Sequence, residues 1–448
     1  MILSRRKKLS AGTLNRRIFS AAVLVAALTL ATKFVALGKE MLSSRAFGTG
    51  DAMDAFLNAY VLPAYAVTVL ATQLNAALIP VFIGVREKEG AAAAQRLFSG
   101  ALVLSISLLA CATVLLTIVA PVVLPLLCAG FSPEKIQFTL RLFYLLLPII
   151  LLSGLVINCE AALNAGEKFA VAALASAAVP FATMAAIWTL APRWGVHSLV
   201  LGIIAGLVLQ FAIVASALKR RGLRFAPRWS GMDANLRNLV AQYAPAVAAG
   251  AMMCSSVLID QSMASRLAPG SVAVLNYGNK LVSLVLTMGT IALGTAVLPY
   301  FSKMVAASDW TGLRHTLKTY IWIIIAITVP FTVAGIALSR PLTALMFQGG
   351  NFTTADTTLV AWVQAMLLLQ LPFYSVSILF VRMISSLQAN RLLVWGTAIS
   401  FVVNISLNYI LMQFMGVAGI ALSTSVVYAV SAAYLGIMLW RKLKAVSS

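Results

Sequence analysis

Residues 97–120 read LFSGALVLSISLLACATVLLTIVA, a stretch of 24 residues without a charged side chain. A helix of about 20 apolar residues crosses the roughly 30 Å hydrocarbon core of a bilayer. Eleven further apolar runs of comparable length occur at 19–37, 54–84, 137–162, 170–191, 197–218, 238–262, 272–301, 316–338, 355–385, 392–412 and 416–439. A β-barrel would instead show alternating strands of about ten residues. The sequence therefore predicts an all-α integral membrane protein with about twelve transmembrane helices.

The composition of the 448 residues excludes a soluble protein. Hydrophobic residues make up 61% of the chain and charged residues 10%, with a mean hydropathy of +0.96. A soluble domain carries about 25% charged residues, because its surface must face water. The predicted connections between spans are short, so we expect no extramembrane domain with chemistry of its own.

The formal net charge of +21 comes from the loops and tails. With both termini in the cytoplasm, 24 of the 33 Lys and Arg residues fall on that side, six on the other and three inside spans. Short cytoplasmic loops of membrane proteins carry such an excess of Lys and Arg. We therefore predict a multi-pass protein with both termini in the cytoplasm, and we interpret the positive charge as a signal of orientation, not of nucleic-acid binding.

The chain contains a weak internal repeat with nearly constant offsets. The matching pairs are 78–82 with 297–301, 162–165 with 386–389, and Gly195-Val196 with Gly416-Val417. Because a six-helix unit has an even number of spans, both copies insert with the same orientation. We predict two parallel six-helix lobes, 1–218 and 238–448, around a central cleft, joined by a basic cytoplasmic linker at 219–237. This is a transporter architecture.

Prolines occur within or near many of the apolar runs, where each removes a backbone donor and tends to kink a helix. Most of them are expected to be structural. Pro80 and Pro299 occupy related positions in the repeat. We predict that this pair forms hinges.

Ionisable residues at membrane depth are costly and by default face a cavity. Lys33, Lys39 and Lys280 are the basic residues not assigned to loops; Asn279 adjoins Lys280 in the eighth predicted span, and Asp260 lies in the seventh. We predict that these five residues line a cationic central cavity. Two alternatives for Lys280 are a position at the membrane interface and a pairing with Asp260.

A second group of residues is expected to be structural. Asp54 follows Gly48-Thr49-Gly50-Asp51, a pattern typical of a helix start, where a carboxylate meets the positive end of the helix dipole. Asp356, after Thr353-Thr354, is interpreted in the same way. We therefore assign Gly48, Gly50 and Asp54 to structural or hinge roles.

Three lysines with few buried acids favour an anionic substrate such as a phosphate or diphosphate. A cation-coupled multidrug exporter would place carboxylates at its site. A membrane-bound glycosyl- or acyltransferase is disfavoured, because the sequence has no nucleophile elbow, paired-carboxylate motif or phosphate-binding glycine loop. We expect no catalytic residues, no metal site and no cofactor. The energy source, a coupling ion or the membrane potential, is left open.

The signature Thr32-Lys33 … Gly38-Lys39-Glu40 … Arg45-Ala46-Phe47-Gly48-Thr49-Gly50 … Asp54-Ala55-Phe56 resembles the MurJ/MviN lipid II flippases of the multidrug/oligosaccharidyl-lipid/polysaccharide exporter superfamily. The segments 275–281 and 347–356 add to the resemblance. It implies a bacterial inner-membrane flippase that moves an undecaprenyl-diphosphate-linked saccharide by alternating access, in peptidoglycan and cell-wall biosynthesis. It also implies that Lys33, Lys39 and Lys280 stand where the family has cationic residues. Membrane lipids and cell-envelope synthases are the other implied partners.

The sequence departs from the family pattern in the second span. Ala64 and Val67 stand where family members usually have Asn and Arg, and Thr72-Gln73-Leu74-Asn75 replaces a familiar Glu-Gly segment. The chain also ends at twelve predicted spans, where many members have two more. An exopolysaccharide or O-antigen repeat unit is therefore the alternative substrate.

Overall fold

The computed structural model describes residues 11–166, 169–220, 227–229, 231–307, 309–387, 389 and 391–447. Within these ranges the chain forms helices and one isolated β-bridge between Gly349 and Phe352, with no strand. The first half contains α1 (Ala11–Phe47), α2 (Asp51–Ala66), η1 (Val67–Thr72), α3 (Gln73–Lys88), α4 (Ala91–Leu127), α5 (Pro133–Leu146), α6 (Pro148–Ala165), α7 (Phe169–Ala175), α8 (Ala178–Trp194) and α9 (His197–Lys219). The second contains α10 (Ala234–Ala264), α11 (Ser271–Ala306), α12 (Trp310–Ala337), α13 (Ser339–Phe347), α14 (Thr354–Leu368), α15 (Gln370–Ser386), α16 (Arg391–Met415) and α17 (Val417–Ser447).

Ten helical segments among the described residues are long and apolar enough to cross a membrane, and each coincides with a predicted apolar run. The other two predicted runs, 19–37 and 272–301, lie within α1 and α11, which are 37 and 36 residues long. The all-α membrane fold is therefore confirmed. The count of twelve spans stays a prediction.

Several spans are interrupted, and prolines lie at or near two of the breaks. In the second span the π-helical turn η1 separates α2 from α3, one turn after Pro63. Pro148 opens α6 at its first turn, where the missing N–H has no helical partner to lose. Pro80 lies inside α3, which continues through it. Pro299 lies in α11, but its side chain is outside the described part, so both hinge assignments stay predictions.

The backbone has matching features at positions where the sequence repeats. Gly195 and Gly416 each precede a span in a left-handed conformation, with φ values of 53° and 57°, which glycine adopts without steric cost. Helix breaks at Leu147, between α5 and α6, and at Leu369, between α14 and α15, occur at corresponding places in the fourth and tenth predicted spans. The predicted linker 219–237 includes residues 221–226 and 230, which lie outside the described residues.

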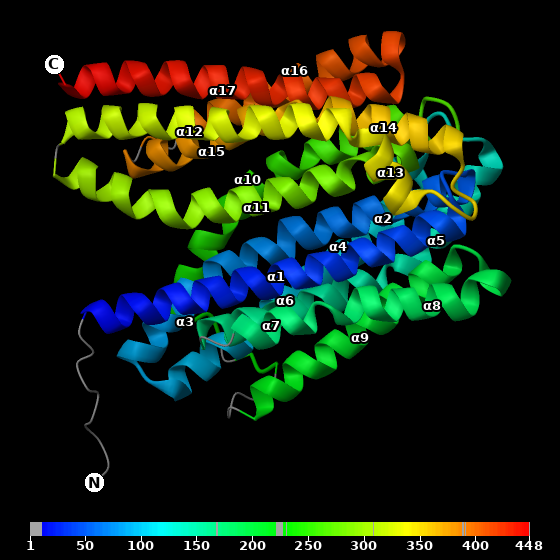
Figure 1. The fold of residues 1–448 in the computed structure, drawn as a ribbon. Coiled ribbons are helices and arrows are strands. Elements are labelled where there is room, and N and C mark those ends of the chain that lie inside the picture. The colour runs from blue at the N-terminus through cyan, green and yellow to red at the C-terminus, as the bar shows by residue number, and fades with distance from the viewer. Residues whose placement is uncertain are drawn as a thin grey trace.

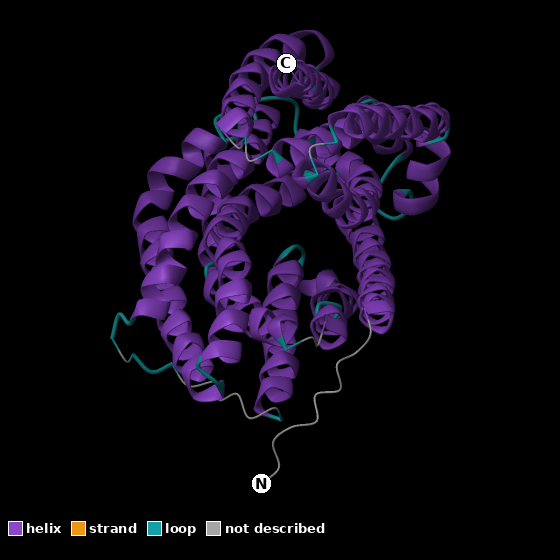
Figure 2. Cartoon of the chain, turned by 90° about the vertical axis from the view of Figure 1, so that its left-hand side faces the viewer, coloured by secondary structure: helices purple, strands orange, loops and turns teal. Residues whose placement is uncertain are grey.

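The helices form two groups. Figure 1 shows α1 to α9 in one group and α11 to α17 in the other, with the start of α1 and the end of α17 at the same end of the molecule. The groups diverge toward that end, and seen from it the helices surround a central region (Figure 2). Helix α10 contacts both groups, packing on α3 and α4 as well as on α16.

Candidate functional site

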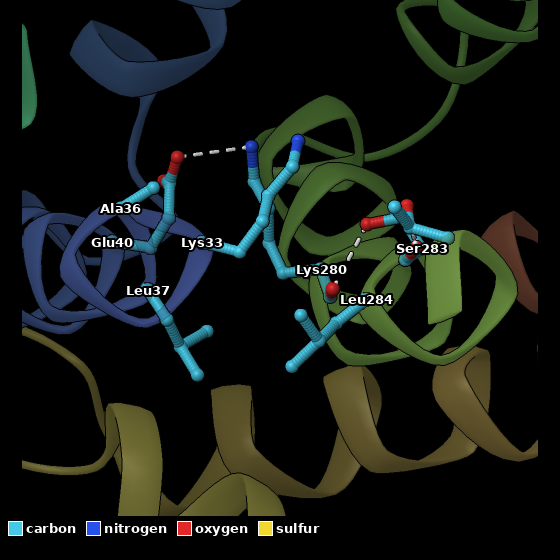
Figure 3. Close-up of a pocket in the computed structure, with 8 residues that line it drawn as sticks. Lys33, Ala36, Leu37, Glu40, Lys280, Ser283 and Leu284 are labelled. Atoms are coloured by element: carbon cyan, nitrogen blue, oxygen red, sulfur yellow. Dashed lines mark hydrogen bonds and ion pairs between the residues drawn. The ribbon is translucent and has the colours of Figure 1, made fainter. Parts of the chain in front are cut away.

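A pocket of about 250 Å³ lies between α1 and α11, which belong to the two different groups of helices. Its lining residues are Lys33, Ala36, Leu37 and Glu40 from α1 and Lys280, Ser283, Leu284 and Thr287 from α11. Figure 3 shows the two lysines and Glu40 directed toward the space between the helices. The pocket therefore places charged side chains between two helices that are distant in the sequence.

Helical periodicity explains why these residues share a pocket. Side chains three, four and seven positions apart lie on one face of a helix. Lys33, Leu37 and Glu40 have this spacing on α1, and Lys280, Leu284 and Thr287 have it on α11. The Ser283 hydroxyl donates to the Lys280 carbonyl at 2.9 Å. Each helix thus presents to the pocket one face that carries a lysine and further polar side chains beside a leucine.

Glu40 is the centre of the charge cluster. Its Oε1 lies 2.7 Å from the Nζ of Lys39 and 3.1 Å from the Nζ of Lys280. The side chain of Glu40 is 12% exposed, against 23% for Lys39 and 29% for Lys280. A carboxylate this buried needs a paired cation, because an isolated ion costs several kcal/mol to bury. The Glu40–Lys280 ion pair therefore connects α1 to α11 across the pocket.

The structure places the predicted site residues in three different settings. Lys33 and Lys280 line the pocket together, and Lys39 joins them through Glu40. Asn279 is exposed and does not line the pocket, because adjacent residues of a helix point in different directions. Asp260 lies on α10 and lines a different pocket.

The pairing of Lys280 with Asp260, one of the alternatives drawn from the sequence, is wrong. Lys280 pairs with Glu40, whereas Asp260 Oδ1 accepts hydrogen bonds from Asn404 at 3.2 Å and Asn408 at 2.6 Å. The physical reason is the packing of α10, which places Asp260 against α16 and in a second pocket. The two charges lie on consecutive helices but belong to separate sites.

Asp54 also has a partner that its sequence context did not predict. Helix α2 begins at Asp51 with Gly50 as its N-cap, so Asp54 does not cap its own helix. Its carboxylate instead accepts from the backbone N–H groups of Gly270, at 2.7 Å, and Ala273, at 2.9 Å. Lys135 lies 3.1 Å away. Asp54 therefore compensates the positive end of α11, in the other half of the chain. Asp356, by contrast, forms the expected capping box with Thr353.

Next to Asp54, the two halves of the chain meet through four glycines, which we call the glycine seam. A Cβ atom at any of them would collide with backbone of the other half. The contacts are Gly48 with Asn351, Gly130 with Ser265, Gly270 with Thr49, and Gly350 with Arg45. Gly50, with φ −75°, has an ordinary extended conformation and takes no part.

Hydrogen bonds reinforce the glycine seam. The Asn351 N–H donates to the Arg45 carbonyl at 2.9 Å, and the Ser265 hydroxyl donates to the Leu127 carbonyl at 2.8 Å. The Thr49 hydroxyl donates to the Asp356 carboxylate. Because these bonds join residues more than a hundred positions apart, they hold the two halves together near the end of α1 at Phe47.

Glu40 was missed as a functional residue by the sequence reasoning. Its spacing of seven residues from Lys33 places both on one face of α1, which was the available signal. The partner of Glu40 on α11 could not be found in this way, because helical spacing reports only on one helix.

Comparison with known proteins adds to this geometry. Residues 43–448 match the family model described as lipid II flippase MurJ. A probable lipid II flippase MurJ of Rhizobium tropici is 26% identical over 94% of this chain and 80% of its own length. One of Synechocystis is 26% identical over 92% of this chain and 80% of its own length.

Solved structures share the fold. A lipid II flippase MurJ in an inward closed conformation superposes with a TM-score of 0.78, at 21% identity over 93% of this chain and 87% of that one. An inward-facing multidrug resistance transporter of the MATE family gives 0.76, at 14% identity over 95% and 99%. The match to the family model spans most of the sequence, and the chain belongs to the lipid II flippase MurJ family.

Proposed function

We propose that this protein is a flippase that moves an undecaprenyl-diphosphate-linked saccharide, lipid II or a related cell-envelope precursor, across the bacterial inner membrane by alternating access. The observation that carries the proposal is the charge cluster between α1 and α11. Lys39 and Lys280 pair with one carboxylate, Glu40, and Lys33 lines the same pocket, which leaves a net charge of +2 in and beside the pocket. A diphosphate diester carries two negative charges, which would balance this net charge of +2.

The lysines would act by exchanging partners. Without substrate, Glu40 compensates Lys39 and Lys280. When the diphosphate enters, its oxygens take over these cations together with Lys33, because a phosphate offers several acceptors where Glu40 offers one carboxylate. The Glu40–Lys280 connection between α1 and α11 is then replaced by contacts through the substrate. Binding therefore changes what joins the two halves of the protein.

Alternating access requires that one end closes while the other opens. The glycine seam holds the halves together at one end, and the helices diverge toward the end with both termini (Figure 1). With both termini in the cytoplasm, this conformation would receive substrate from the inside. The lobes 1–218 and 238–448 would then rock to open the seam, with Pro80 and Pro299 as hinges.

Orientation has its own test. In a cysteine-free background, a cysteine in place of Arg228 should react with a membrane-impermeant maleimide only after the membrane is permeabilised. Cysteines within 122–136 and 340–354 should react in intact cells. External labelling at 228 would contradict the inward-loading proposal.

The sign of the pocket separates the flippase from a cation-coupled multidrug exporter, which shares this fold family. A site for cationic drugs would carry an excess of carboxylates, but this pocket carries an excess of lysines. Val67 and the segment beginning at Thr72 depart from the family pattern. A related lipid-linked saccharide, such as an exopolysaccharide or O-antigen repeat unit, is therefore the alternative substrate.

Depletion and complementation test the cargo. A bacterium depleted of its own lipid II flippase accumulates its undecaprenyl-linked precursor inside, and expression of this chain should restore growth and clear that precursor. Lys318→Ala, at an exposed site outside the pocket, should complement like wild type. If the chain reaches the membrane but clears only another lipid-linked saccharide, lipid II is not its substrate.

A further inference from the structure

Four helices carry a polar side chain at the same depth, between the lysine pocket and the glycine seam. The four residues, which we call the polar layer, are Ser43 on α1, Asn58 on α2, Gln261 on α10 and Tyr277 on α11. Two of them come from each half of the chain. None of the four lines the lysine pocket. The polar layer is therefore a set of groups for which the lysine pocket does not account.

The ion pair between α1 and α11 fixes the depth of two members. Ser43 is three residues after Glu40 on α1. Tyr277 is three residues before Lys280 on α11. Because Glu40 and Lys280 are paired, each member lies one helical turn, about 4.5 Å, from the ion pair and on the same face of its helix. On both helices this step leads toward the glycine seam.

Contacts at the seam fix the depth of the other two members. Asn58 is four residues after Asp54, whose carboxylate binds the backbone at the start of α11. Gln261 is four residues before Ser265, whose hydroxyl donates to the Leu127 carbonyl in the seam. Residues four apart lie on one face of a helix, one turn from each other. Asn58 and Gln261 therefore lie one turn inside the seam, as Ser43 and Tyr277 do.

Each member of the polar layer has a buried atom without a hydrogen-bond partner among the described residues. These atoms are the hydroxyls of Ser43 and Tyr277 and the amide oxygens of Asn58 and Gln261. Seven such atoms occur in the described part of the chain, so more than half of them lie in this layer. Ser43 and Asn58 are 1% exposed and Tyr277 is 0% exposed. Buried polar atoms are paired in most structures, so the unpaired ones destabilise the conformation that buries them.

Opening of the seam would expose the polar layer. Ser43 and Asn58 belong to the first half of the chain, and Gln261 and Tyr277 belong to the second, so separation of the halves uncovers all four. Their hydroxyl and amide groups suit a neutral ligand rich in hydroxyls. The first sugar of a lipid-linked saccharide is bonded directly to the diphosphate. With the diphosphate on the lysines, a sugar on the seam side would lie at the depth of the layer.

On the basis of the flippase function proposed above, we propose that the polar layer binds the sugar next to the diphosphate when the seam is open, and that the saccharide thereby stabilises the outward-open state. A ligand shifts a conformational equilibrium only by its difference in affinity for the two states. The layer supplies this difference, because it is inaccessible while the seam is closed. A site made of hydrogen-bonding groups also discriminates against a ligand that lacks the matching hydroxyls.

The test follows the opening of the seam in the full-length protein. Spin labels are placed at positions 134 and 354, which are exposed and lie close to the seam in opposite halves. Double electron–electron resonance in nanodiscs then measures their separation with lipid II or with undecaprenyl diphosphate, which lacks the sugars. We expect lipid II to populate the longer distance several-fold more than undecaprenyl diphosphate does. In Ser43→Ala/Tyr277→Phe, which removes two hydroxyls and adds no volume, the two lipids should act alike.

Ser198→Ala/Tyr243→Phe is the matched control. It also removes two buried hydroxyls, but these donate to backbone carbonyls at 2.7 and 2.8 Å. The control should lower the melting temperature of the protein without ligand and should keep the difference between the two lipids. Ser43→Ala/Tyr277→Phe should leave the melting temperature unchanged or raise it. A fall as large as that of the control would show that these hydroxyls are bonded in the closed state and would overturn the proposal.

Failure of the sugar site can be distinguished from failure of the flippase function. If the advantage of lipid II persists in Ser43→Ala/Tyr277→Phe, the polar layer is not the sugar site, while the flippase function stands. Equal action of the two lipids on the protein with an intact layer has the same meaning. If neither lipid binds or moves the spin labels, and no lipid-linked saccharide is flipped in liposomes, the flippase function is wrong and the sugar site with it.

Discussion

The glycine seam and the lysine pocket both join the same two halves of the chain, but they do so by opposite means. At the seam, backbone meets backbone, and there is no room for a Cβ atom at Gly48, Gly130, Gly270 or Gly350. At the pocket, the halves are linked through the ion pair of Glu40 with Lys280 beside a cavity. The seam is held by close backbone packing. At the pocket the halves are joined by an ion pair, which an anionic substrate could replace. A transporter needs both, one to seal and one to respond.

The largest effect is expected at Asp54, which holds the start of α11 beside the seam. Asp54→Ala leaves two buried N–H groups without their acceptor and removes one of the two carboxylates that pair with Lys135, which keeps Asp51 at 2.6 Å. Unsatisfied buried groups cost about 1–3 kcal/mol each, so we expect the seam to loosen and complementation to be lost. External cysteine labelling in the pocket, at position 283, should rise. Unchanged labelling together with normal growth would contradict the role of Asp54 in the seam.

Gly270→Ala tests whether the seam depends on shape. The new Cβ atom would meet the Thr49 backbone, and the backbone at φ +89° would be strained by roughly 1–2 kcal/mol. Gly416→Ala is the matched control, because it has a similar strain at φ +57° but open space around it. We expect external labelling at position 283 to rise only for Gly270→Ala. If both variants behave alike, backbone strain and not contact explains the result.

Glu40→Gln tests the pocket. We expect a smaller effect than at the seam, with substrate binding and transport changing in opposite directions. The substitution removes the charge that pairs with Lys39 and Lys280, so the net charge of the cluster rises. An anionic substrate should bind several-fold more tightly. Transport should slow, because no carboxylate is present to re-form the ion pairs with Lys39 and Lys280 when the substrate leaves. Binding of an undecaprenyl diphosphate and flipping rate are measured separately. A parallel loss of both would mean that Glu40 is needed only for packing.

The smallest effect is expected at Asn279. It lies next to Lys280 but is exposed and outside the pocket. Asn279→Ala should therefore change complementation by less than about twofold, since surface substitutions usually alter stability by no more than 0.5 kcal/mol. A strong defect in precursor clearance at a normal protein level would place Asn279 in the substrate path and would enlarge the site beyond the pocket.

The helices and the pocket lysines could be predicted from the sequence, but the contacts between the two halves could not. Apolar runs were sufficient for the ten spans because the bilayer fixes their length. Lys33 and Lys280 were found because an ionisable residue in such a run is rare. The partners of Glu40 and Asp54 in the other half of the chain lie more than 200 residues away, at the start of α11 and within it, and helical periodicity carries no information on which helices meet. The alternative pairing of Lys280 with Asp260 was wrong because helix packing places the two residues in different pockets.

Reconstituted flipping tests the central claim that the lysines neutralise the diphosphate of a lipid-linked saccharide. The purified protein is placed in liposomes with fluorescent lipid II, and quenching from outside follows its movement between leaflets. We expect flipping by wild type and by Lys33→Arg/Lys280→Arg, which keeps the charge, and no flipping by Lys33→Ala/Lys280→Ala at equal reconstitution. Full transport by the double alanine variant would show that the cationic pocket is not the substrate site.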